Sequence, residues 1–175
     1  MSRLNPAVTL RPATEENRPA LEALRVAPHQ YDFINTVEEA FLEAEEEPDG
    51  RAIRFGLYDG DTLVGFVMIS DEVGNPSYVA HYLWKLMIDE ALQRRGYGTA
   101  ALDLVADHFR SRGVDTMWTS TTEGEDSPIN FYERYGFVRQ GQARGARSCC
   151  ASICERNDEG GPARARPSKR GGGVI

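Results

Sequence analysis

The chain has 175 residues, a length that suits one domain with a substantial core, and its formal net charge is −7. Residues 1–142 hold 13 basic and 24 acidic residues, whereas residues 143–175 hold 7 basic and 3 acidic residues. The acidity of residues 1–142 disfavours nucleic acid as a partner and would attract a cationic substrate. No apolar run approaches the roughly 18 residues of a membrane span and no signal-peptide pattern is present, so we expect a cytoplasmic protein without a membrane partner.

The first third of the chain predicts one strand and two helices. Residues 7–11 alternate as a short strand does, and Pro12 ends it. A first helix is predicted from a Thr14 cap to about residue 27, where Pro28 should break it. A second helix is predicted over residues 36–46. One face of that helix is apolar and the other carries glutamates, which we interpret first as a solvated surface: Glu38, Glu39, Glu43, Glu45, Glu46 and Glu47.

The middle of the chain predicts three strands. The β-rich runs 53–59 and 63–70 are joined by Asp-Gly-Asp at residues 59–61, which is the strongest hairpin signal in the sequence. Residues 78–88 form the fourth and most apolar run, and we expect this strand to be buried on both faces. Trp84 and Met87 within it are more typical of a core than of a site.

A glycine-rich turn follows this strand at residues 93–100, Gln-Arg-Arg-Gly-Tyr-Gly-Thr-Ala, and opens a helix predicted over residues 98–112. Gly96 and Gly98 allow a sharp turn and the close approach of a ligand. The unpaired amide groups of the first helical turn, reinforced by Arg94 and Arg95, would hold a phosphate or pyrophosphate. A dinucleotide-binding turn is disfavoured, because it needs a third glycine and a carboxylate after the next strand. His108 lies on the apolar face of the helix, where packing is the more common role.

The rest of the body predicts a strand at residues 116–121, a helix from Pro128 to residue 135, and a sixth strand at residues 137–140. Strands that alternate with helices after an N-terminal hairpin indicate an α/β protein with a mixed sheet. Residues 143–175 are rich in Arg, Gly, Ala and Pro, and we expect disorder there apart from a short strand near residues 148–154. We also hypothesise a shifted reading frame near Gly141.

The turn resembles the acetyl-CoA signature of the GNAT acyltransferase superfamily, which Gln93, Gly96 and Gly98 match. Residues 130–137, Asn-Phe-Tyr-Glu-Arg-Tyr-Gly-Phe, resemble the second landmark of that family, a short helix that carries a tyrosine and ends in Gly-Phe. The resemblance covers about residues 7–141. It implies an acetyltransferase domain at residues 1–142, with a GNAT fold of six to seven strands flanked by about four helices and acetyl-CoA as the acetyl donor.

The resemblance also implies roles for particular residues. Tyr132 matches the tyrosine that protonates the coenzyme A thiolate, a step for which a phenol has a suitable pKa. Backbone amides near Met87 and Ile88 would stabilise the oxyanion where the fourth strand splays from the fifth. Glu125 stands where many members have an asparagine. The pyrophosphate would be held by the turn: Gln93, Arg94, Arg95, Gly96, Tyr97, Gly98 and Thr99.

The acceptor is expected to be a small primary amine. Residues 82–89 and 24–30 look like those of bacterial diamine, spermidine and spermine N-acetyltransferases, which makes a polyamine the preferred substrate. Its predicted contacts are Asp32, Glu38, Glu43 and Trp84. A protonated amine needs a base, which the sequence leaves open among five carboxylates: Glu22, Asp32, Glu38, Glu43 and Asp89.

Alternatives to a polyamine acetyltransferase are an enzyme that modifies antibiotics, an enzyme that acetylates peptides, and a module that binds acetyl-CoA without turnover. Relatives that dimerise through their C-terminal strands leave a homodimer open. The three cysteines, Cys149, Cys150 and Cys154, have no spacing typical of a metal site or a disulfide framework, so we assign neither.

Overall fold

The computed structural model describes residues 6–46, 52–71, 81–114, 116–142 and 148–151. Its strands form one mixed sheet in the order β1-β2-β3-β4-β5-β7-β6. The strands are β1 Val8–Pro12, β2 Ala52–Asp59, β3 Thr62–Ser70, β4 Tyr82–Ile88, β5 Trp118–Thr121, β6 Val138–Gln142 and β7 Ser148–Ala151. Neighbouring strands are antiparallel except for β4 and β5, which are parallel. The predicted α/β class with a mixed sheet is therefore confirmed.

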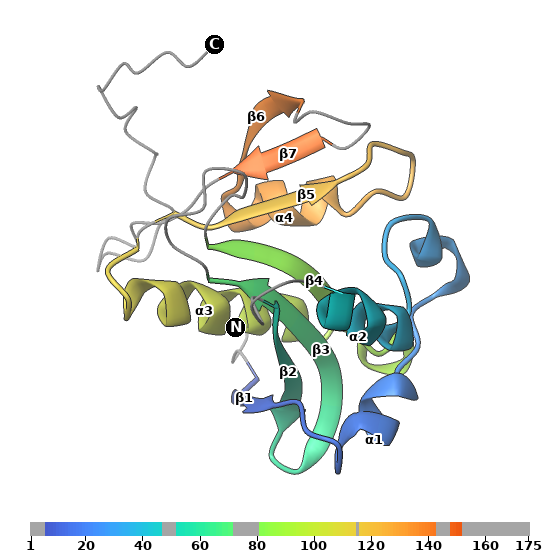
Figure 1. Ribbon diagram of the computed structural model, residues 1–175. Coiled ribbons are helices and arrows are strands. Elements are labelled where there is room, and N and C mark those ends of the chain that lie inside the picture. The colour runs from blue at the N-terminus through green and yellow to red at the C-terminus, as the bar shows by residue number, and fades with distance from the viewer. Residues whose placement is uncertain (1–5, 47–51, 72–80, 115, 143–147, 152–175) are drawn as a thin grey trace.

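Four α-helices and two short 3-10 helices complete the described residues. They are α1 Arg18–Glu22, η1 Pro28–Asp32, α2 Val37–Glu46, η3 Glu90–Leu92, α3 Tyr97–Arg110 and α4 Ile129–Tyr135. In Figure 1, α2 lies in front of the twisted β1–β4 sheet and α3 lies behind it, while β5, β6, β7 and α4 form the upper part of the molecule. None of the helices in the described residues is long and apolar enough to cross a membrane.

Two hydrophobic clusters lie on the two faces of the sheet. The larger cluster packs α3 and α4 against the sheet, with Leu102, Val105 and Phe109 of α3 almost wholly buried. The second cluster packs α1 and α2 against the other face through Leu21, Phe41 and their neighbours. The apolar spacing of α2 and α3 explains this arrangement, because a stripe of period 3.6 must be buried against a sheet.

The first helix is shorter than the sequence predicted. Thr14 does not cap it; instead the Thr14 N–H donates to Asn17 Oδ1 (2.8 Å) in a turn that precedes the helix, and α1 then lasts only five residues. Pro28 does not simply end a helix either. It opens η1, where its fixed φ suits a first helical position and Gln30 Oε1 accepts from the Ala27 N–H.

The fourth strand also differs from its prediction. Alternate residues of β4 are only partly buried, so the strand is not enclosed on both faces along its length. It begins at Tyr82, and the earlier part of the predicted strand lies outside the described residues. Most of the C-terminal tail, from residue 152, likewise lies outside them, while β7 coincides with the start of the strand predicted near residues 148–154.

Candidate functional site

The glycine turn builds an anion-binding geometry at the start of α3. Gly96 takes the N-cap position with φ of 93°, a conformation that favours glycine. The first intrahelical bond joins the Ala100 N–H to the Gly96 carbonyl at 3.0 Å, so the N–H groups of residues 97–99 precede it. These N–H groups and the positive end of the dipole of the 14-residue helix are both at the N-terminus of α3, where they would bind a phosphate.

Several side chains of the turn hold the turn itself. Gln93 Nε2 donates to the Ile88 carbonyl (2.9 Å) and to Gln30 Oε1 (2.7 Å), which fixes the turn against β4 and η1. The Tyr97 hydroxyl donates to Asp59 Oδ2 at 2.7 Å, and this hydrogen bond raises the pKa of Tyr97. Anion contacts would therefore come from backbone N–H groups and from Arg94, which is exposed with φ of 62°.

The helix that carries Tyr132 packs directly against this turn. A Cβ built at Gly98 would lie 3.1 Å from Cζ of Phe131, so the absence of a side chain there lets α4 approach α3 closely. Tyr135 adds a second connection, because its hydroxyl donates to Asp103 Oδ1 of α3 at 2.8 Å. The two sequence landmarks, more than thirty residues apart, thus meet in space.

Tyr132 is held firmly within this packing. It is 8% exposed, and its ring contacts those of Phe131 and Phe137 with centroids 5.3 and 5.2 Å away. Gly136, with φ of 123°, ends the helix and turns the chain so that Phe137 can pack back on Tyr132. Because two aromatic neighbours already fix the Tyr132 ring, little further conformational entropy would be lost when its hydroxyl donates a proton to a bound group.

A β-bulge interrupts the pairing of β3 with β4. Met68 of β3 is opposite Lys85 and the next residue, Ile69, is opposite Leu83, so Trp84 is the extra residue of β4. A bulge bends its strand, and the β4–β5 ladder contains one registered pair, Tyr82 with Trp118. The carboxyl half of β4, with Met87 and Ile88, therefore runs beyond the β5 ladder.

On the opposite face, one carboxylate of α2 turns towards β4. Glu43 Oε2 lies 2.9 Å from Lys85 Nζ, and Glu43 Oε1 accepts from Asn35 Nδ2 at 2.6 Å. Lys85 is 8% exposed, so its ammonium is largely removed from water and compensated by this pair. Sequence reasoning missed Lys85, although a lysine inside the apolar run 82–88 was an available signal.

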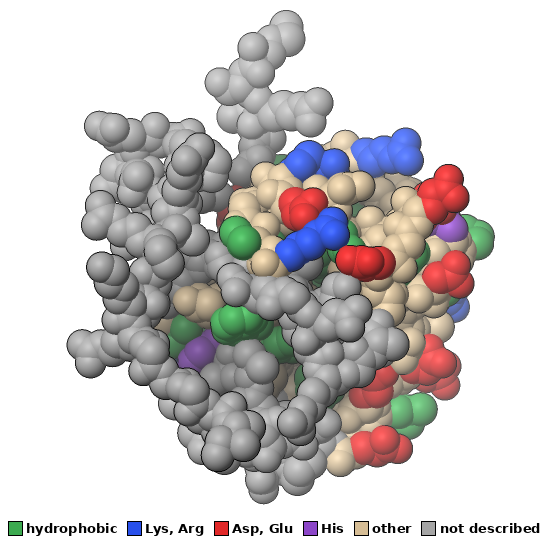
Figure 2. All heavy atoms as spheres, turned by 90° about the horizontal axis from the view of Figure 1, so that it is seen from above, with side chains coloured by type: hydrophobic (Ala, Val, Ile, Leu, Met, Phe, Trp, Pro, Cys, Tyr) green, Lys and Arg blue, Asp and Glu red, His purple; other side chains and the backbone are tan. Residues whose placement is uncertain are grey.

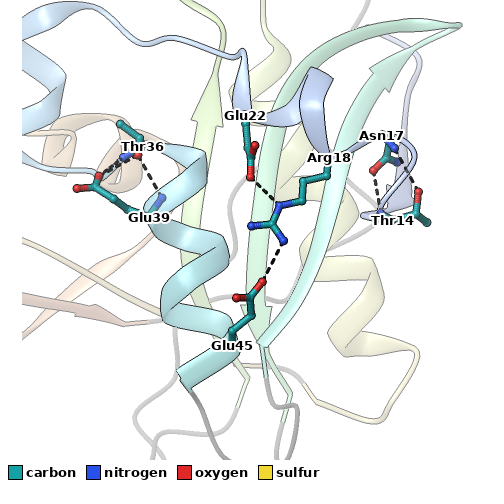
Figure 3. A network of polar contacts seen from close by, with 7 residues as sticks. All are labelled: Thr14, Asn17, Arg18, Glu22, Thr36, Glu39 and Glu45. Atoms are coloured by element: carbon teal, nitrogen blue, oxygen red, sulfur yellow. Dashed lines mark hydrogen bonds and ion pairs between the residues drawn. The ribbon is translucent and has the colours of Figure 1, made fainter.

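The other predicted acceptor residues are not joined into this pair. Asp32 and Glu38 are exposed on η1 and α2, and Trp84 is half-buried beside the second cluster. Figure 3 shows an ion-pair network between the two helices, in which Arg18 of α1 pairs with Glu22 of α1 at 2.7 Å and with Glu45 of α2 at 3.0 Å. The interpretation of this face as a solvated surface agrees with the exposed Glu38, Glu39, Glu45 and Glu46, although Glu43 is half-buried and paired with Lys85.

Glu39 shows the capping role most clearly. Its carboxylate accepts from the Thr36 N–H at 2.8 Å, while the Glu39 N–H donates to Thr36 Oγ1 at 3.2 Å, a reciprocal capping box (Figure 3). The backbone hydrogen bond from Thr36 lowers the pKa of Glu39. Among the open base candidates, Asp89 is likewise used as a cap, accepting from the Ala91 N–H at 3.1 Å.

His108 belongs to a separate polar cluster at the far end of α3. Its Nε2 lies 3.3 Å from Asp71 Oδ2, and His81 and Arg112 pair with the same carboxylate. This arrangement favours the packing role expected from the sequence. Within the ranges that the structure describes, no group of three or more His, Cys, Asp or Glu side chains could hold a metal ion.

Comparison with known proteins gives the family. The model of the acetyltransferase (GNAT) family matches residues 10–137, which span both landmarks. The chain belongs to the GNAT family. Acetyl-CoA is accordingly its acetyl donor, and the glycine turn and the Tyr132 helix lie within the matched region.

The relatives resemble this GNAT protein over different shares of their length. Spermine/spermidine N(1)-acetyltransferase of Bacillus subtilis is 27% identical over 142 residues, which are 78% of this chain and 91% of the relative. The ribosomal protein bS18-alanine N-acetyltransferase of Escherichia coli is 34% identical over 55 residues, 31% of this chain and 37% of that protein. The crystal structure of spermidine N-acetyltransferase from Vibrio cholerae has a TM-score of 0.60 at 17% identity, covering 84% and 94% of the two chains.

Proposed function

We propose that this protein is an acetyl-CoA-dependent N-acetyltransferase whose acceptor is a small polyamine such as spermidine or spermine. The observation that carries the reaction is the contact between Gly98 and Phe131, which places the anion-binding turn beside the Tyr132 helix inside the family-matched region. The polyamine is supported by the Bacillus subtilis relative, because that similarity extends over nearly the whole relative.

The charge of the protein supports a cationic acceptor. Acidic side chains line the right-hand side of the face in Figure 2, the side on which η1 and α2 lie in Figure 1. Glu43 adds little to this attraction, because its carboxylate is already paired with Lys85 and Asn35. A polyamine would approach along exposed carboxylates such as Asp32 and Glu38.

The reaction joins the acceptor nitrogen to the acetyl carbon and breaks the bond from that carbon to sulfur. The amine must first lose a proton, because with a pKa near 10.4 fewer than about one molecule in a thousand is neutral at pH 7. Tyr132 would give its phenolic proton to the departing thiolate. Backbone amides of the carboxyl half of β4, near Met87 and Ile88, would donate to the carbonyl oxygen as it becomes negative.

A panel of acceptors tests the proposal. Coenzyme A thiol release would be measured with acetyl-CoA and spermidine, spermine, putrescine, an aminoglycoside, a lysine peptide and a peptide that begins with alanine. We expect kcat/KM to be highest for spermidine or spermine. Higher values for the aminoglycoside or for either peptide would refute the polyamine assignment and retain the enzyme class.

A second candidate, N-terminal acetylation of a protein, is favoured by the higher local identity to the bS18-alanine enzyme. That similarity covers only 37% of the Escherichia coli protein, so it is weaker support for a shared acceptor than the similarity to the Bacillus subtilis relative, which covers 91% of that protein. The alanine peptide in the panel separates the two candidates directly.

A further inference from the structure

One glutamine side chain anchors the short helix η1. Gln30 is the third residue of η1, and its Oε1 accepts two hydrogen bonds, from the Ala27 N–H at 3.1 Å and from Gln93 Nε2 at 2.7 Å. The Gln30 backbone adds to this anchor, because its N–H donates to the Ala27 carbonyl (2.8 Å) and its carbonyl accepts from the Phe33 N–H (2.9 Å). A 3-10 helix of five residues has little stability of its own, so these contacts decide where η1 lies.

The partner of Gln30 belongs to the glycine turn. Gln93 comes three residues before Gly96, and its Nε2 also donates to the carbonyl of Ile88, the last residue of β4, at 2.9 Å. One amide group therefore joins the end of β4, the turn that precedes α3, and η1. The bond to Gln30 connects positions 63 residues apart, so it depends on the fold and not on local sequence.

The other end of η1 meets the loop that leads to the Tyr132 helix. A Cβ built at Gly124 would lie 3.1 Å from Cζ of Phe33, the residue that ends η1, so the loop between β5 and α4 comes close to the Phe33 ring. In Figure 1 the blue segment between α1 and α2 reaches towards that loop. Contacts to the glycine turn and to the β5–α4 loop thus hold η1, which carries the exposed Asp32, a predicted contact of the acceptor.

This arrangement connects the two substrates of the proposed reaction. Phosphates held by the N–H groups of residues 97–99 would fix the turn to which Gln93 belongs. A fixed Gln93 keeps its bond to Gln30, and η1 with Asp32 then stays in place for the amine. We propose that Gln30 is a positioning residue that couples the two sites, so that bound coenzyme A raises the affinity for the polyamine and the polyamine raises the affinity for coenzyme A by the same factor. This role rests on the proposed function, because it requires both substrates.

Two variants of Gln30 test the coupling. Both side-chain hydrogen bonds described above are accepted by Oε1, so the carboxylate of Gln30→Glu can accept them too, whereas Gln30→Met has a similar shape and loses both. The Kd for spermidine would be measured by calorimetric titration without and with saturating coenzyme A, which has no acetyl group to transfer. The ratio of the two constants removes any effect of the added charge on spermidine itself.

The expected ratios follow from the worth of one hydrogen bond. Coenzyme A should lower the Kd for spermidine about two- to tenfold in the wild type and in Gln30→Glu, and should leave it unchanged in Gln30→Met. Gln93→Met should lose the coupling as well. The double variant with methionine at both positions should have the same ratio as either single variant, because the two side chains act through one contact.

A purely structural role of Gln30 gives a different result. It would lower the Tm of ligand-free Gln30→Met and weaken spermidine equally with and without coenzyme A, so the ratio would remain that of the wild type. Coupling that persists in either methionine variant, or a ratio of one in the wild type, would overturn the proposal. If the wild type binds coenzyme A but not spermidine in either state, the proposed acceptor itself is refuted, together with the role that depends on it.

Discussion

Replacing Gly98 tests the anion site most sharply, because two variants of the same shape differ only in charge. Gly98 lies in the first turn of α3 with a helical backbone, so neither Gly98→Glu nor Gly98→Gln strains the chain. Both must move the Phe131 ring by a few tenths of an ångström, since a Cβ would lie 3.1 Å from its Cζ. Any difference between them therefore reports the charge.

The size of that difference follows from the position of the carboxylate. A glutamate in the first turn would bring its charge to roughly 5 Å from a phosphate held by the same amides, which costs about 1 kcal/mol in water and about 3 kcal/mol at an effective dielectric constant of 20. The Kd for acetyl-CoA should thus be about fivefold to 200-fold higher in Gly98→Glu than in Gly98→Gln. Added salt should narrow the gap.

Calorimetric titration measures both constants, and thermal melting controls for folding. The Tm of Gly98→Glu should match or exceed that of Gly98→Gln, because negative charge is favourable at a helix N-terminus. Equal Kd values for the two variants would show that the phosphates lie elsewhere, and the reasoning from the unpaired amides would be refuted.

Three further predictions concern Tyr132, Glu39 and Asp71. Tyr132→Phe should lower kcat at least tenfold and leave the Kd for acetyl-CoA within about twofold; equal losses in steady-state and binding assays would make it a binding residue. Glu39→Gln tests the helix cap. Because the hydrogen bond from Thr36 lowers the pKa of Glu39, the charged carboxylate stabilises the fold above the ordinary pKa of 4.5 and loses that effect as pH falls through the lower pKa of the folded state. The difference in Tm between Glu39→Gln and the wild type should therefore disappear in acid. A gap independent of pH would contradict this. Asp71→Asn leaves two histidines and Arg112 around a neutral group, and it should lower the free energy of unfolding by about 1–3 kcal/mol in denaturant titrations. The Kd for acetyl-CoA should not change, because the cluster is at the opposite end of α3. A higher Kd in this variant would contradict that separation.

Local signals predicted much of the fold. The hairpin of β2 and β3, the helices α2 and α3, and the glycine that ends α4 each depend on spacing or turn residues within a few positions, and their bounds agree to within two residues. The first helix failed because Thr14 and Asn17 bond to each other's backbone, which competes with helix formation at that point.

The sequence predicted which motifs make up the candidate site, but not the side-chain contacts between them. Gln93, Gly96, Gly98 and Tyr132 stand out in the sequence, yet the meeting of Gly98 with Phe131 depends on how α3 and α4 pack. The bulge at Trp84 depends on the register with β3, which no local pattern records. For the same reason the Glu43–Lys85 pair emerged only from the structure.

The most direct test of the account quantifies both products of one reaction. The protein would be incubated with acetyl-CoA and spermidine, and free coenzyme A thiol and N-acetylspermidine would be measured in the same samples by thiol titration and mass spectrometry. We predict that the two products appear in equal amounts and that neither forms without the amine. Thiol release without acetylated spermidine, or no reaction while acetyl-CoA still binds, would contradict the proposal that this protein transfers acetyl groups to a polyamine.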